Sequence, residues 1–242
     1  MGKLNELTGL EAATKIAKRE ISSVELVQDC LDHISSREDD VGAWQFLDPE
    51  YAIAEARRSD ELDPIGPFHG VPFGVKDVID TGDMPTEYGS EIFAGNQPLA
   101  DAACVSMMRK SGAVLLGKTV TTEFAVYQWK KTRNPHDIRH TPGGSSSGSA
   151  AAVGDNMVPL AFGNQTAGSL IRPASFCGVH AFKPTHGTAN LRGIFEMVPR
   201  FDTLGYMARS VDDLAVFYAI VSKDKLIPRK VEALDKPPRI GI

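Results

Sequence analysis

The side chains of this 242-residue chain that are best suited to chemistry lie in two stretches rich in serine and glycine and in one apolar segment. The stretches span residues 142–153 and 164–173, and Lys76 lies in the segment GVPFGVKDVID. A serine hydroxyl is a weak nucleophile and needs a base nearby. A lysine among apolar residues can supply that base near neutral pH, because its ammonium form is disfavoured there. Glycines beside a serine leave backbone N–H groups free to face an oxyanion.

Each of these features alone also has an ordinary structural interpretation. Lys76 fits a strand-end lysine whose ammonium group reaches water. Clusters of glycine and serine before helices serve as turns or caps. It is the combination of a lysine in an apolar strand with two Ser/Gly loops that indicates serine-nucleophile chemistry.

The segments GVPFGVKD, PGGSSSGSAAAV, QTAGSLIRPASFCGV and FKPTHG resemble, in this order and spacing, the amidase-signature family. The resemblance runs from the N-terminal helices through GAVLLGKTVTTEFA to FDTLGYMARSVDDLA, so it covers nearly the whole chain. It implies hydrolysis of a carboxamide C–N bond to a carboxylic acid and ammonia or an amine, with no cofactor and no metal. The implied fold is α/β, with a mixed central sheet covered by helices on both faces.

The resemblance also assigns roles to individual residues. It places the family's lysine base on Lys76, its bridging serine, which follows a cis peptide bond, on Ser145, and its nucleophile on Ser169. The family's oxyanion hole, made of backbone N–H groups, falls on Thr166, Ala167, Gly168 and Ser169. The implied mechanism is a Lys–Ser–Ser proton relay that forms a seryl acyl-enzyme, which water then hydrolyses.

Four positions depart from the commonest family pattern. Ser147 and Ala167 stand where glycines are usual, and Gln165 stands where an aspartate is frequent. Arg172 lies three residues after Ser169, where many members place the arginine two residues after. Ala167 would be strained if its position required a positive φ.

Other motif interpretations are weaker. Residues 144–148 fit G-x-S-x-G, but a nucleophile elbow follows a strand directly, and HTPGG does not have the pattern of a strand. His136 and His140 are spaced like metal ligands but have no third ligand beside them. Cys177 fits a small buried apolar residue better than a nucleophile.

Composition limits the class of protein and its partners. Apolar residues make up 42% and charged residues 24% of the chain, as in ordinary globular proteins. The formal net charge of -5 and the absence of a long basic run argue against nucleic acid or an anionic membrane as partner. Three widely spaced cysteines indicate reduced thiols, and no segment has the length of a signal peptide or a membrane span. We therefore expect a cytoplasmic protein that acts on a small-molecule amide, with a homodimer left open.

The element pattern predicts two regions, an N-terminal helical segment over 1–64 that packs on the core and an amidase-signature core over 65–242. Helices are expected between Leu7 and Asp60, with Ser23 as a cap. Further along, the pattern predicts a long polar loop over 128–149 and a short one over 164–169. Buried strands are expected within 70–80, 113–118, 157–163 and 178–185.

The C-terminal sequence KPPRIGI has the pattern of a strand that is just beginning. We therefore expect the core to be truncated after Ile242, with an apolar edge of the sheet uncovered. On this basis we expect the isolated chain to aggregate or stay partly unfolded and to lack useful amidase activity. Two alternatives to a complete amidase stay open, namely the amidase component of a glutamine-dependent tRNA amidotransferase and a catalytically inactive fragment.

Overall fold

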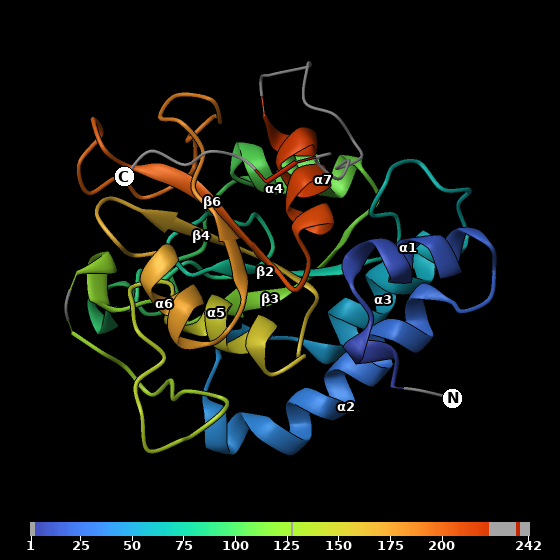
Figure 1. Ribbon diagram of the computed structural model, residues 1–242, viewed down its shortest axis with the longest axis horizontal. Helices are drawn as coiled ribbons and strands as arrows, with labels where there is room; N and C mark the ends of the chain where they lie inside the picture. Colours follow the sequence, from blue (N-terminus) through green and yellow to red (C-terminus); the bar gives the residue numbers. More distant parts are fainter. Residues whose placement is uncertain (1–2, 127, 223–235, 238–242) are drawn as a thin grey trace.

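The computed structural model describes residues 3–126, 128–222 and 236–237, and it confirms the expected α/β class (Figure 1). Its sheet is mixed, with six strands in the order β1-β3-β2-β4-β6-β5. The strands are β1 (Trp44–Leu47), β2 (Pro72–Lys76), β3 (Val114–Thr119), β4 (Leu160–Gln165), β5 (His180–Phe182) and β6 (Thr203–Ala208). Strand β2 runs parallel to both of its neighbours, β3 and β4. The carboxyl ends of these three strands therefore meet at one edge of the sheet.

Helices cover both faces of this sheet (Figure 1). Helices α5 and α6 lie over one face and α4 and α7 over the other, while α1, α2 and α3 gather at one end of the molecule. The helices are α1 (Gly9–Ala17), α2 (Ser23–Val41), α3 (Pro49–Asp60), α4 (Ala103–Lys110), α5 (Ser147–Gly154), α6 (Ile171–Phe176) and α7 (Val211–Val221). None of the helices in the described part of the chain is long and apolar enough to cross a membrane.

Local signals fix where the N-terminal helices begin. Thr8 and Glu11 form a capping box at the start of α1, and Ser22 and Glu25 form one at the start of α2. The cap of α2 is thus Ser22, one residue before the predicted Ser23, because Glu25 must lie three residues after the cap to bond back to it. The division of the chain at residue 64 stays a prediction, and β1 joins the N-terminal segment to the sheet by pairing with β3.

The elements differ from the sequence-based expectation at several places. The strand expected to be buried within 178–185 is β5, whose residues are exposed or half-buried because it is the edge strand of the sheet. Strand β6 and helix α7 lie where no element was predicted. Strand β1 interrupts the region expected to be wholly helical, and it has only four residues, too few to show a clear alternation. Helix α6 follows the second Ser/Gly loop, where no helix was predicted. Strand β4 begins at Leu160 and not at Met157, consistent with Pro159, which has no N–H to donate to a ladder. It also extends to Gln165, so Asn164 and Gln165 belong to the strand and not to the loop.

Close packing brings the start of α5 against the sheet. A Cβ added to Gly148 would lie 2.3 Å from the carbonyl oxygen of Ala43 and from the amide nitrogen of Val120. Only glycine fits at this contact, because backbone atoms cannot move aside as a flexible side chain can. On the opposite face the aromatic rings of Phe162, Tyr206 and Phe217 pack together, with the centroids of Phe162 and Phe217 4.5 Å apart. The sheet is therefore buried on both sides around β2 and β4.

The β5 edge of the sheet carries exposed apolar side chains. β5 is the outermost strand and pairs only with β6 within the described residues. A cavity of about 490 Å³ lies between β5 and α7, lined by apolar residues such as Phe182, Val211 and Leu214. Ile171 and Phe176 of α6 are also exposed. The predicted strand at the C-terminus falls largely on residues 238–242, outside the described residues.

We expect this surface to cause self-association of the chain. Replacing Phe182 and Val211 with lysine removes apolar contact area and adds repulsion, so the double variant should be shifted toward monomer in sedimentation velocity. Leu99→Lys is the matched control, because Leu99 is fully exposed but lies far from β5 in the sequence. An equal shift in the control, or a wild-type chain that is monomeric at micromolar concentration, would contradict this prediction.

Candidate active site

Lys76, the last residue of β2, lies at the centre of the candidate site. Its side chain is fully buried. The Nζ atom lies 2.7 Å from Oγ of Ser145 and 2.6 Å from Oδ1 of Asn164, at hydrogen-bonding distance from both. The fold thus brings the predicted base to the predicted bridging serine, 69 residues away along the chain.

The local structure explains why this lysine is held in the interior. Every residue of β2 is buried. Directly after the strand the chain turns, and the N–H groups of Val78 and Ile79 both donate to the carbonyl of Lys76, at 2.7 and 3.0 Å. Burial lowers the pKa of Lys76 to about 7, while the carboxylate of Asp202 acts in the opposite direction. A large share of the Lys76 amine is therefore neutral near pH 7, as a base requires.

The Gly144–Ser145 peptide is cis, as the family resemblance implied. Its surroundings hold the backbone on both sides of Ser145. The guanidinium of Arg172 donates from Nε and Nη2 to the carbonyl oxygen of Gly144, at 3.0 and 2.9 Å. The N–H of Thr122 donates to the carbonyl oxygen of Ser145 at 3.2 Å. The unusual spacing of Arg172 thus still brings its side chain to the loop of the bridging serine.

The second Ser/Gly loop lies directly beside the first. The N–H of Ser146 donates to the carbonyl oxygen of Ser169 at 3.1 Å. The hydroxyl of Ser169 makes no hydrogen bond to any described residue, and none joins it to the hydroxyl of Ser145. The structure therefore places the Ser145 and Ser169 loops in contact and leaves the Ser169 hydroxyl unengaged.

The backbone of residues 166–169 is held from both ends. Gln165 accepts at Oε1 from the N–H groups of Leu170 and Ile171, at 2.9 and 3.0 Å, and so closes the loop. The hydroxyl of Thr166 donates to the carboxylate of Asp202. None of the N–H groups of residues 166–169 donates to another described residue, so these groups remain available to an oxyanion. Ala167 is not among the described residues with positive φ, so its Cβ causes no backbone strain of the kind that a positive φ would produce.

The nucleophile-elbow interpretation of residues 144–148 finds no support. Residues 141–144 form no strand before the serines. Ser146, the serine that would be the nucleophile in that interpretation, is fully buried. Its hydroxyl donates to the carbonyl oxygen of Asn164 at 3.3 Å. The side chain of Ser146 thus packs the loop onto β4.

Two parts of the site were missed by sequence reasoning. The sequence predicts a loop at Asn164, although its position after the apolar run LAFG is a signal that a strand can continue. Lys118 is the second such residue, and it lies in the buried strand β3 in the same way that Lys76 lies in β2. The rule that flagged Lys76, a lysine within an apolar strand, would also have found Lys118.

Comparison with known proteins identifies the family of the chain. The Amidase family model matches residues 25–238, and the chain belongs to that family. A glutamyl-tRNA(Gln) amidotransferase subunit from Chloroflexus aggregans is 38% identical over 232 residues, which are 92% of this chain and 48% of the relative. The chain thus spans about half the length of the curated relatives it matches.

Solved structures give the same result. Native peptide amidase from Stenotrophomonas maltophilia superposes with a TM-score of 0.85 at 35% identity, covering 96% of this chain and 51% of the amidase. A 6-aminohexanoate cyclic dimer hydrolase, solved with its substrate, has a TM-score of 0.83 at 31% identity, covering 97% of this chain and 50% of the hydrolase. These structural neighbours are amide-hydrolysing enzymes of the same fold.

Asn164→Asp tests the electrostatics of the site. A carboxylate beside Nζ favours the ammonium form and should raise the pKa of Lys76 by about 1–3 units. The neutral fraction at pH 7 then falls from about one half to about a tenth for the first unit and about tenfold for each further unit, and reactivity that depends on it should recover only at higher pH. The measurement is the rate of covalent labelling of the chain by a fluorophosphonate as a function of pH.

The matched control is Asn134→Asp, which adds the same charge at another buried asparagine, in the 128–142 segment. It should leave the pH profile unchanged. If Asn164→Asp also left the midpoint where it is in the wild type, the assigned contact between Lys76 and Asn164 would be wrong.

Proposed function

We propose that this chain carries the catalytic machinery of a serine amidase that hydrolyses a carboxamide C–N bond. The observation that carries the proposal is the 2.7 Å contact between Nζ of Lys76 and Oγ of Ser145 at a fully buried site. A lysine with a pKa near 7 beside a serine is suited to proton transfer at physiological pH. The unengaged hydroxyl of Ser169 next to four free N–H groups supports its assignment as nucleophile.

Acylation follows from this arrangement. Neutral Lys76 accepts the proton of the Ser145 hydroxyl, and Ser145 accepts the proton of Ser169 as Oγ of Ser169 attacks the amide carbon. The N–H groups of residues 166–169 stabilise the oxyanion of the tetrahedral intermediate. The C–N bond then breaks, the proton returns along the same path to the leaving nitrogen, and an ester on Ser169 remains.

Deacylation uses the same groups in the same order. Water attacks the ester carbon and gives its proton through Ser145 to Lys76. The bond between the acyl carbon and Oγ of Ser169 breaks, and the proton returns to Ser169. The sum is one amide and one water converted to one carboxylic acid and one amine or ammonia, with no further reactant.

We infer that turnover also needs polypeptide beyond the described residues. The exposed apolar surface at β5 and the doubled length of the curated relatives support this inference. Positioning of a substrate supplies a large part of an enzymatic rate, and the relay alone does not provide it. We therefore expect the isolated chain to react with small electrophiles at Ser169 but to hydrolyse amides poorly.

A second candidate function is that of the amidase component of a tRNA amidotransferase. It is favoured by the relatives named as glutamyl-tRNA(Gln) amidotransferase subunits, which are 36–38% identical to this chain. In that case the protein works with other subunits and takes its amide from glutamine. Release of ammonia from glutamine in preference to simple aryl and aliphatic amides would distinguish it from a stand-alone amidase.

The cellular setting is proposed on simpler grounds. All three cysteines, Cys30, Cys104 and Cys177, are buried free thiols, which supports a reducing compartment such as the cytoplasm. We keep a small-molecule amide as the substrate class, with neither nucleic acid nor membrane as a direct partner. A homodimer stays an untested prediction.

The nucleophile assignment is tested by labelling and substitution. A fluorophosphonate should form its adduct on Ser169, located by peptide mass spectrometry, and Ser169→Ala should abolish it. In a form of the protein that turns over amides, the same change should reduce kcat at least about a thousandfold. Ser175→Ala, at an exposed serine of α6, is the control and should behave as the wild type. An adduct on Ser145 or Ser146 would refute the assignment.

A further inference from the structure

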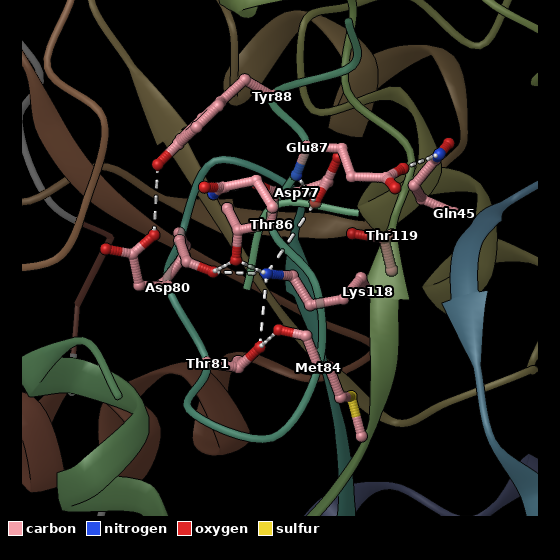
Figure 2. Close-up of polar contacts among 12 residues, drawn as sticks. Gln45, Asp77, Asp80, Thr81, Met84, Thr86, Glu87, Tyr88, Lys118 and Thr119 are labelled. Carbon is pink, nitrogen blue, oxygen red and sulfur yellow. Dashed lines mark hydrogen bonds and ion pairs between the residues drawn. The ribbon is translucent and has the colours of Figure 1, made fainter. Parts of the chain in front are cut away.

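A second fully buried lysine, Lys118, lies in β3 next to the strand that carries Lys76 (Figure 2). Its Nζ atom donates to the carbonyl oxygen of Ile79 at 2.6 Å and to the hydroxyl of Thr86 at 2.6 Å. The nearest carboxylate oxygen, Oδ1 of Asp77, lies 3.8 Å away. The ammonium group of Lys118 is therefore in contact with the segment of residues 77–86, which directly follows Lys76.

Lys118 points to the face of the sheet opposite to the catalytic serines. Lys76 is the register partner of Thr119, and Val75 is the partner of Lys118. Since successive side chains of a strand alternate between faces, Lys76 and Lys118 project in opposite directions. Thr119 contacts Ser149 of α5, on the face where the serine loops lie. Lys118 is therefore not a second base of the relay.

Asp77 completes the contacts behind the base. Its carboxylate accepts from the N–H groups of Glu87 and Gly89, at 3.0 and 3.2 Å. Its own N–H donates to the carbonyl oxygen of Thr119 at 2.9 Å. Asp77 thus binds the 80–90 loop to the end of β2, one residue after Lys76 (Figure 2).

The short turn after Lys76 is fixed at both ends. The carbonyl of Lys76 accepts from Val78 and Ile79, and the carbonyl of Ile79 accepts from Lys118. Without Lys118, the carbonyl oxygen of Ile79 and the hydroxyl of Thr86 would each lose the hydrogen bond that they accept from its ammonium group. The turn would then keep its contacts with residues 193–195, where the N–H of Phe195 donates to the carbonyl oxygen of Val78 at 2.8 Å, but it would lose its bond to Lys118 on the face opposite to the serine loops.

Stability alone does not account for a lysine at this position. Burial lowers the pKa of Lys118 to about 8 and raises that of Asp77 to about 6, and the opposite charge of each partner counters the shift. Buried ion pairs are often no more stabilising than apolar side chains of similar volume. What an apolar side chain cannot supply is the set of directed bonds to Ile79 and Thr86.

We propose that Lys118 is a positioning residue for Lys76, which holds the turn of residues 76–79 so that the amine of Lys76 stays in contact with Ser145 and away from water. The proposal rests on the proposed function for the role it gives to Lys76. It adds that the base depends on a cation on the opposite face of the sheet.

The groups around Lys76 determine how this must be tested. Ser145 and Asn164 face its amine as neutral partners, Asp202 acts on it from the segment before β6, and Asp77 and Lys118 lie behind it. Removing Lys118 alone would raise the pKa of Lys76 simply because a neighbouring cation is lost. The double variant Lys118→Met with Asp77→Asn removes one charge of each sign, so a remaining shift reports a change in the burial of Lys76 that the loss of either residue can cause. Thr86→Val, which leaves both charges in place, assigns the shift to Lys118.

The experiment is an NMR titration of the lysine ε-carbons in ¹³C-lysine-labelled chain, with the Lys76 signal assigned by its loss in Lys76→Met. The wild-type midpoint should lie near pH 7. In the double variant it should rise by about one unit or more, because Lys76 reaches water. Asp213→Asn is the control, since Asp213 is a buried carboxylate that accepts from Gly9 and Leu10. The control should lower the melting temperature without moving the midpoint.

A midpoint in the double variant within about 0.3 units of the wild type would overturn the proposal. Thr86→Val removes one contact of Lys118 and should raise the Lys76 midpoint by a smaller amount. If the double variant does not fold, an unchanged midpoint in Thr86→Val overturns the proposal. The titration reads Lys76 whether or not the protein hydrolyses amides. Absence of amide hydrolysis would thus count against the proposed function, and absence of a shift against the role of Lys118.

Discussion

The burial of the Lys76 amine is the interaction on which the rest of the site depends. A buried ammonium group loses its hydration, and two hydrogen bonds replace that hydration only in part. Burial therefore stabilises the neutral amine relative to the ammonium form and lowers the pKa of Lys76. The amine lies between the hydroxyl of Ser145 and the amide oxygen of Asn164 and has no carboxylate in direct contact among the described residues. A carboxylate in the place of Asn164 would hold the lysine charged and useless as a base.

The fold provides this environment through parallel strands. β2, β3 and β4 end at one edge, so a residue at the end of each can reach a common point. Gly148 lets α5 approach the backbone of Ala43 and Val120, and this brings the Ser145 loop down onto the end of β2. The 166–169 loop leaves β4 beside it, closed by the side chain of Gln165. Two loops and one strand end thus meet at the same edge of the sheet.

The sequence predicts those parts of this arrangement in which the residue types are unusual for the segment that contains them. A lysine in an apolar strand and serines among glycines are visible in a single sequence, and the family resemblance assigned the order Lys76, Ser145, Ser169. The sequence does not predict β1, because this strand is too short to show a periodicity. It also does not predict that Asn164 belongs to a strand, because a polar side chain at this position is typical of a loop until the neighbouring strand is known. The contact of Arg172 with the Gly144 carbonyl depends on the geometry of two loops, which no spacing rule contains. The face to which Lys118 points follows from strand register, and register is set by pairing between distant segments.

The most direct test of the account is the pH dependence of covalent modification of Ser169 in the wild-type chain. If neutral Lys76 activates the nucleophile through Ser145, the rate constant for labelling by a fluorophosphonate must follow the neutral fraction of Lys76. It should be low in acid, rise with a midpoint near pH 7, and be lost in Lys76→Met. A rate independent of pH, a midpoint near the ordinary lysine value of about 10.4, or undiminished labelling in Lys76→Met would contradict the account.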